Sequence, residues 1–335
     1  MTIKDLAEKT GYGIATVSRV LNNQPNVSEK ARRAIMQAVE ESGFQINANA
    51  RQLKQHATGI LAVVKGTSNE LFADIVEAIQ KLVSYTPYPL YVDYMDEDSN
   101  EVLRGVQLCR EKKPLGILFL GGNRVNFLAD FKKIDIPCVL VSDDASGLPF
   151  ANLSSVCTDD RQAARCAMDS LIALGHRDFA IVGGDRETSD TSRLRYEGCM
   201  QSFQKHGIEF DEEKAYQGVR FSYMDGYNAT QQLIANDCHF TALFAEADVM
   251  AIGAIRALHN NGLRVPQDVS VMGFDGLALG SFLVPQLSTV VQSAETMARR
   301  SVEILINCIE HGGEAVHEFV PYSLAQRESS RRVGD

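Results

Sequence analysis

The chain has 335 residues, of which 45% are hydrophobic and 23% charged, with a formal net charge of −10 at pH 7. This length predicts two or three domains, and the composition is that of an ordinary globular protein and not of a disordered or fibrous one. No apolar stretch approaches the roughly 18 residues of a membrane span. The chain opens without a basic-then-apolar leader, so we expect a cytoplasmic protein without a membrane partner.

The charge is unevenly distributed. Residues 1–57 carry eight basic and five acidic residues, a surplus of three positive charges that leaves −13 for the remainder. A basic segment ahead of an acidic body fits local contact with nucleic-acid phosphates. The seven cysteines are scattered and form no CxxC pair, which indicates buried reduced thiols and not disulfides or a zinc site. We expect no metal and no cofactor.

The first 22 residues predict two short helices. Thr2 is a suitable N-cap for the first helix, and Gly-Tyr-Gly at 11–13 forms a turn before the second. Two helices joined by such a turn match a helix-turn-helix, whose second helix can enter a major groove. For this stretch alone, a helix with a merely solvated polar face is the alternative. The second helix has Ile14, Val17, Val20 and Leu21 on its apolar side, Ala15, Arg19 and Asn22 on the opposite side, and Thr16 and Ser18 at the margins.

A third helix is predicted after Ser28 and ends before Gly43. Residues 45–57 are polar without strong periodicity, which is typical of a linker that orders on binding. From residue 58 onward, short apolar runs alternate with helical patterns, which predicts an α/β protein with parallel sheets covered by helices on both faces. A break near 157–160 indicates two similar subdomains. The expected strands are 60–64, 90–94, 116–120, 138–141, 179–182, 242–244 and 269–273, and the expected helices are 71–85, 101–112, 160–174, 195–206, 224–235, 248–260 and 295–310.

Several ordered motifs resemble the lactose/galactose repressor (LacI/GalR) family. They include TIKDLA at 2–7, ATVSRVLN at 15–22, NANARQL at 47–53, and segments at 27–28, 40–44, 174–177, 192–198, 248–254, 265–271, 273–275 and 285–290. The resemblance spans residues 2–328. It implies a helix-turn-helix DNA-binding domain (1–44), a hinge (45–57) and a core like that of periplasmic sugar-binding proteins (58–330). That core would comprise an N-subdomain of about 58–157 and 290–320 and a C-subdomain of about 158–288, with the chain crossing between them three times.

The resemblance also assigns DNA-binding roles. Bases would be faced by Ala15, Thr16 and Arg19, with Ile14 at the mouth of the groove, and phosphate or sugar by Ser18, Asn22 and Asn26; Lys4 would lie near the operator. A hinge helix over 50–53, which includes Ala50 and Arg51, would fold on operator binding, and Leu53 would wedge open a minor-groove step. Asn47, ahead of this helix, is also expected to bind DNA. Two positions depart from the family. Gly13 replaces the usual serine cap, and Ile46 replaces the usual proline, so the residue at which the hinge begins is not fixed by the resemblance.

Candidate effector residues follow the strands, because ligands of open α/β sheets bind beyond the carboxyl ends of strands. Arg195, expected at the opening of a helix, and Asp275, after the strand 269–273, match the leading effector positions of the family. A guanidinium and a carboxylate can hold vicinal hydroxyls, and an ordinary salt bridge is the alternative. Phe72 and Phe221 match ring contacts, with core packing as the alternative. Asp143 and Asp248 complete the effector set, while Asp159 and Asp160 either line the cleft or cap a helix.

No pattern in the sequence indicates an enzyme, since P-loop, GxGxxG, GxSxG and HExxH motifs are missing. The sequence therefore predicts a sequence-specific transcriptional regulator, most simply a repressor, that binds an operator as a homodimer. A small effector, a sugar first and a purine corepressor second, would bind between the subdomains. A stand-alone sugar- or nucleoside-binding receptor is the rival interpretation, and the basic helical head argues against it.

Overall fold

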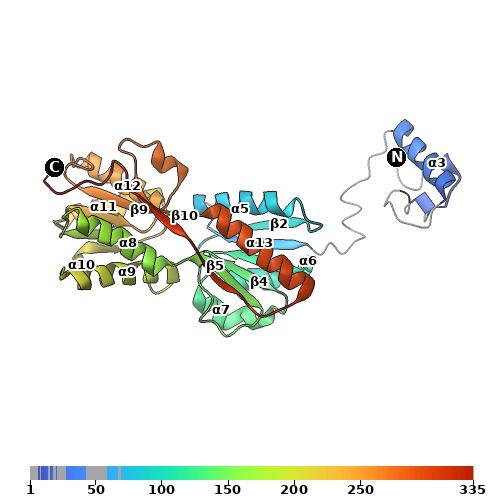
Figure 1. The fold of residues 1–335 in the computed structure, drawn as a ribbon, viewed down its shortest axis with the longest axis horizontal. Helices are drawn as coiled ribbons and strands as arrows, with labels where there is room; N and C mark the ends of the chain where they lie inside the picture. The colour runs from blue at the N-terminus through green and yellow to red at the C-terminus, as the bar shows by residue number, and fades with distance from the viewer. Residues whose placement is uncertain are drawn as a thin grey trace. The chain divides into compact units, whose positions relative to one another are not determined.

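The computed structural model describes residues 7, 9–13, 16, 17, 20, 28–42, 59–66 and 69–334. The chain divides into two compact units, Met1–Ala57 and Thr58–Asp335 (Figure 1). In the first unit, α3 (Glu29–Ser42) begins after Ser28, whose Oγ accepts a hydrogen bond from the Ala31 amide at 3.3 Å. A small core gathers apolar residues of all three predicted helices: Ala7, Val17, Val20, Ile35 and Ala38.

The second unit contains two six-stranded sheets. The sheet of the first lobe has the order β11-β5-β4-β3-β1-β2 and is entirely parallel. Its elements are β1 (Ile60–Lys65), α5 (Glu70–Val83), β2 (Leu90–Met95), α6 (Glu101–Lys112), β3 (Gly116–Leu120), α7 (Arg124–Asp130), β4 (Cys138–Val141), β5 (Leu153–Thr158), α13 (Ala294–His311) and β11 (His317–Val320).

The sheet of the second lobe has the order β12-β10-β9-β8-β6-β7, in which β12 alone runs antiparallel to its neighbour. Its elements are α8 (Asp160–Ala173), β6 (Phe179–Gly183), α9 (Asp190–His206), α10 (Glu212–Ala215), β7 (Tyr216–Gly218), α11 (Tyr223–Ala235), β8 (Ala242–Ala245), α12 (Asp248–Asn260), β9 (Ser270–Asp275), β10 (Ser288–Gln292) and β12 (Tyr322–Ala325). None of the described helices is long and apolar enough to cross a membrane.

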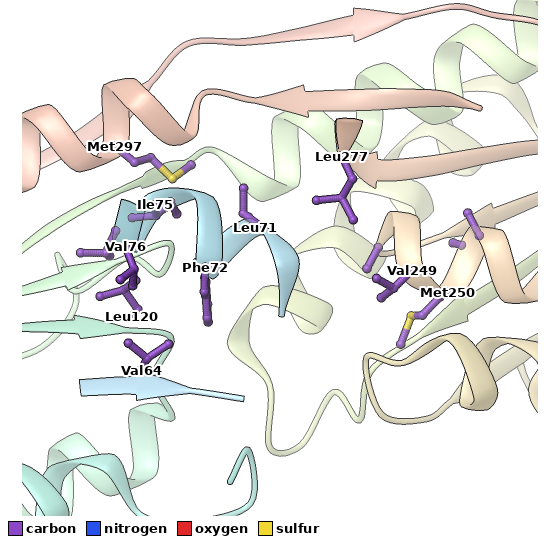
Figure 2. Close-up of a cluster of buried hydrophobic side chains, with 14 of the residues drawn as sticks. Val64, Leu71, Phe72, Ile75, Val76, Leu120, Val249, Met250, Leu277 and Met297 are labelled. Atoms are coloured by element: carbon purple, nitrogen blue, oxygen red, sulfur yellow. The ribbon is translucent and has the colours of Figure 1, made fainter. Parts of the chain in front are cut away.

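Both faces of each sheet are covered, which explains why the inner strands read as continuous apolar runs. In β1, Ile60, Ala62 and Val64 face the core beneath α5 and α13, whereas Leu61 and Val63 face the core beneath α6 and α7. The first of these cores continues into the second lobe. Figure 2 shows Phe72 of α5 with Val64 and Leu120, while Leu277 and Val249 belong to the same cluster from the other lobe.

The chain crosses between the lobes three times, as the resemblance implies. The crossings follow β5, β10 and β11. One expected boundary is wrong: β10 pairs with β9, so residues 288–292 belong to the second lobe, and the first lobe resumes only at α13. The terminal segment also returns to the second lobe, because β12 pairs with β10 and the Val271 amide donates to the carbonyl of Ser329.

Two glycines allow α11 and α12 to pack closely. A Cβ at Gly253 would lie 2.1 Å from the Tyr223 carbonyl oxygen, and a Cβ at Gly226 would lie 2.5 Å from that of Met250. We expect Gly253→Ala to lower the free energy of unfolding by about 1–3 kcal/mol through overpacking, measured by urea denaturation. Gly147→Ala, where the added methyl group meets only the end of the Arg124 side chain, should leave it nearly unchanged.

Candidate functional site

A cavity of about 640 Å³ lies between the two lobes, within the range of roughly 300–1,000 Å³ typical of small-molecule sites. It opens where strands of both sheets end, as expected for this class of fold. Five of the six predicted effector residues line it. From the first lobe these are Phe72 and Asp143, and from the second lobe Arg195, Phe221 and Asp275.

Arg195 lies in the buried wall of this cavity. The expectation that it opens its helix is wrong, because α9 begins at Asp190, where Ser189 caps it by accepting from the Ser192 amide. Arg195 therefore lies in the second turn of α9. Its Nε donates to Asp160 Oδ1 at 2.8 Å, its Nη1 donates to the Glu246 carbonyl, and its guanidinium carbon lies 3.7 Å from the centroid of the Phe274 ring.

Asp275 faces Arg195 at the end of β9. Its Oδ1 lies 4.0 Å from Arg195 Nη1 and accepts from Gln292 Nε2 at 2.8 Å. The φ of Asp275 is 119°, a region that non-glycine residues rarely occupy and that is typical of functional sites. Nη2 of Arg195 makes no hydrogen bond with the part of the chain that the structure describes. A donor and an acceptor thus lie side by side, the arrangement that adjacent hydroxyl groups require.

Asp248 does not line the cavity, which corrects its assignment as an effector contact. Its Oδ2 accepts from the amides of Gly276 and Leu277 at 2.9 and 2.7 Å, and its Oδ1 accepts from Thr289 Oγ1 at 2.6 Å. Both oxygens are therefore occupied within the second lobe. Asp248 fixes the loop that follows Asp275 and so acts as a positioning residue.

Asp143 connects the two lobes. One oxygen accepts from the Gly122 amide at 2.9 Å and the other from Thr191 Oγ1, on the opposite lobe, at 2.6 Å. Further contacts cross the cleft: Asn123 Nδ2 donates to the Thr188 carbonyl, Arg220 pairs with Asp96 and Asp98, and the Tyr223 hydroxyl donates to Glu70. The structure therefore represents a conformation in which both lobes contact each other around the cavity.

The two predicted ring contacts both lie against glycines. A Cβ at Gly121 would be 2.9 Å from the Phe72 ring, and a Cβ at Gly184 would be 2.8 Å from the Phe221 ring. The glycine pairs at 121–122 and 183–184, visible in the sequence, thus create the space that the rings occupy. Phe72 is also part of the core, so the two interpretations of this residue, core packing and cavity lining, hold together.

The structure separates the roles of two neighbouring acids that the sequence left open. Asp159 caps α8, because its Oδ1 accepts from the Gln162 amide at 3.0 Å. Asp160 instead orients Arg195. Glu246, which follows β8, is fully buried. Its Oε2 accepts from the Gly184 amide at 3.1 Å, and its Oε1 has no partner among the described residues.

Burial raises the pKa of several acids at or next to this site, among them Asp160 and Asp248. The pKa of Asp143 rises to about 7, that of Glu246 to about 8, and that of Asp275 to about 6, where Arg195 opposes the effect of burial. Among the described residues, no group of His, Cys, Asp and Glu is arranged to hold a metal ion.

We expect the contribution of Glu246 to the free energy of unfolding to fall as the pH rises from about 4.5 to about 8. Over this range the folded state keeps a proton on Glu246 that the unfolded state releases. Below this range both states are protonated, and above it the full cost of the buried charge applies. Thermal unfolding of the wild type and of Glu246→Gln between pH 5 and 9 measures the effect. In Glu246→Gln the free energy of unfolding should change by about 1–3 kcal/mol less between pH 5 and 9 than in the wild type. An equally steep dependence on pH in both proteins would contradict the protonation of Glu246 in the folded state.

Of the predicted DNA-binding residues, the structure describes only Thr16, which is half-buried in a helical segment after Gly13. The others lie outside the described residues: Lys4, Ile14, Ala15, Ser18, Arg19, Asn22, Asn26, Asn47, Ala50, Arg51 and Leu53.

A helical N-terminal unit followed by two lobes around a polar cavity defines a ligand-responsive DNA-binding regulator. Comparison with known proteins gives the same class. The model of "Bacterial regulatory proteins, lacI family" matches residues 2–47, and that of the "Periplasmic binding protein-like domain" matches residues 168–330. The chain is 33% identical to the HTH-type transcriptional regulator MalR of Clostridium butyricum, over 98% of this chain and 99% of that one. It is 30% identical to the probable repressor ExuR of Bacillus subtilis, over 99% of each chain.

The chain belongs to the lacI family of bacterial regulatory proteins. Solved structures agree: a lac repressor dimer bound to operator and an anti-inducer superposes with a TM-score of 0.84 at 25% identity, covering 99% of both chains. A complex of the regulator CelR with cellobiose gives 0.72 at 26% identity, covering 98% of this chain and 100% of that one. The chain is thus a DNA-binding transcriptional regulator with an effector-binding core, and its relatives are transcriptional regulators and not enzymes.

Proposed function

We propose that this protein is a cytoplasmic repressor without enzymatic activity, which binds a pseudo-palindromic operator as a homodimer and responds to a sugar held between Arg195 and Asp275. The observation that carries the effector assignment is the guanidinium and carboxylate pair in the cavity wall, 4.0 Å apart. The rings of Phe72 and Phe221 would cover the apolar face of the sugar. The cellobiose bound by the CelR relative supports this class of effector.

Residues 1–44 would read the operator and residues 45–57 would form the hinge. An effector that weakens operator binding must itself bind more weakly to the DNA complex, because the coupling between two sites is reciprocal. Contacts across the cleft, such as Asp143 with Thr191, would form in one arrangement of the lobes and break in the other. A sugar that favours one arrangement would thereby change the population that is competent to bind DNA.

The proposal is tested by a thermal-shift screen of the full chain against sugars and purines, followed by operator binding with and without the compound that stabilises it. The operator is first selected from random-sequence DNA. A sugar that shifts the melting temperature and changes operator affinity supports the proposal. Purines acting alone would leave a regulator with a different effector and would refute the sugar assignment.

The proposed recognition helix gives a separate prediction. Arg19→Ala should relax the preference at one base pair of the operator and cost about 1–3 kcal/mol of binding, because arginine reads guanine through two hydrogen bonds. Fluorescence anisotropy with operators substituted at each position measures both effects. An unchanged preference at every position would contradict the placement of Arg19 against the bases.

A further inference from the structure

The cavity between the lobes has an unusual balance of charge. Among the described residues that line it, six are acidic: Glu70, Glu97, Asp98, Asp143, Asp185 and Asp275. Only three are basic: Lys65, Arg195 and Arg220. An incoming ligand therefore meets an excess of carboxylates from both lobes.

Each of the three cations is already paired with a carboxylate. Lys65 Nζ lies 2.9 Å from Oε2 of the buried Glu101, and Arg195 Nε lies 2.8 Å from Asp160 Oδ1. Arg220 contacts a run of three acids after β2, with Nη2 2.6 Å from Asp98 Oδ2. A phosphate or carboxylate on a ligand would have to compete with these protein anions for every cation.

The acids are less well compensated. Asp143 is held by a backbone amide and a threonine hydroxyl, and Asp185 by the Glu187 amide and Thr188 Oγ1. The positive end of α12 reaches the cavity at Ala247, but the carboxylate of Asp248 in its first turn already opposes that dipole. The N-termini of α5 and α9, which also reach the cavity, carry Glu70 and Asp190 in their first turns. At the N-terminus of α7 the Asn123 amide donates to Glu101 Oε1. The described helix ends and cations around the cavity thus each face a protein carboxylate.

We propose that this cavity accepts uncharged sugars and rejects sugars that carry a phosphate or a carboxylate. The inference rests on the proposed function, since it specifies which sugars the same site takes. Hydroxyl groups can both donate to Asp275 and accept from Arg195, whereas an anionic group can only accept and would be repelled by the surrounding carboxylates.

The test compares matched ligands on the full chain at pH 8. Calorimetry measures the affinity for the neutral sugars glucose, maltose and cellobiose. It then measures the affinity for the 6-phosphate of each sugar and for glucuronate, the carboxylate counterpart of glucose. We expect the anionic member of each pair to bind at least 100-fold more weakly than its neutral parent. Asp275→Asn keeps the oxygen that accepts from Gln292. This variant should lower the ratio of neutral to anionic ligand affinity at least tenfold. Glu209→Gln, an exposed acid outside the cavity, should leave the ratio unchanged.

A second measurement needs no substitution. Lowering the pH from 8 to 5.5 should narrow the affinity ratio between glucose and glucuronate, because burial raises the pKa of Asp143 to about 7 and that of Asp275 to about 6 and both gain protons over this range. Glucuronate is a stronger acid than these two groups and keeps its charge. An anionic sugar that binds as tightly as its neutral parent would overturn the charge rule and leave the sugar effector intact. An unchanged ratio in Asp275→Asn would also overturn it, since shape and not charge would then set the preference. Binding by neither class would refute the sugar effector itself, and the charge rule with it.

Discussion

Arg195→Ala is expected to lower the free energy of unfolding of the core by about 3–5 kcal/mol, the usual cost of removing one partner of a buried ion pair. The guanidinium is 3% exposed and lies between Asp160 and Asp275, two acids buried in the same wall. Without it, both carboxylates would face each other without a cation. Urea denaturation at pH 8, followed by circular dichroism, measures the loss.

The same helix provides a matched control. The Arg193 side chain is 42% exposed and pairs with the partly exposed Asp190 and Glu197, so Arg193→Ala should cost no more than about 1 kcal/mol. The double variant Arg195→Met with Asp160→Asn removes both partners and should recover part of the loss. If Arg195→Ala cost no more than Arg193→Ala, the guanidinium would not be compensating these acids.

Asp275→Ala should abolish the response to the effector while changing operator affinity less than twofold. The carboxylate supplies the acceptor of the proposed sugar site, and a hydrogen bond to a charged group contributes about 1.5–3 kcal/mol, which is roughly a 10- to 150-fold loss of effector affinity. The proposed DNA contacts lie in the separate unit Met1–Ala57. Operator anisotropy during titration with the stabilising sugar gives both numbers, and loss of operator binding as well would show that Asp275 is structural.

The sequence predicted the α/β class well, because strands buried on both faces appear as short apolar runs between helical patterns. It missed β5, which reads Leu-Ser-Ser-Val-Cys-Thr yet is wholly buried between β4 and β11. Periodicity alone cannot distinguish hydroxyl-bearing residues buried inside a sheet from those of a loop. The short β7 and the strands β10 to β12 were missed as well, since each of them mixes polar and apolar residues.

The sequence predicted only part of the site, because it does not show which way a side chain points. The end of a predicted strand located Asp275, and the family resemblance pointed to Arg195 and Asp143; all three line the cavity. Sequence position could not reveal that Asp248 points toward the amides of Gly276 and Leu277. Nor could it distinguish Asp159 from Asp160, since only the path of α9 decides which acid meets the guanidinium. The individual DNA contacts remain predictions that follow from the order of the motifs.

The three crossings between the lobes restrict how new specificities can evolve. Neither lobe is a contiguous piece of the chain, because α13 and β11 return to the first lobe after β6 to β10, and β12 then completes the sheet of the second. A single recombination event therefore cannot exchange one intact lobe for that of a relative. Substitutions in the loops around the cavity can change the effector while the interwoven scaffold is inherited as a whole.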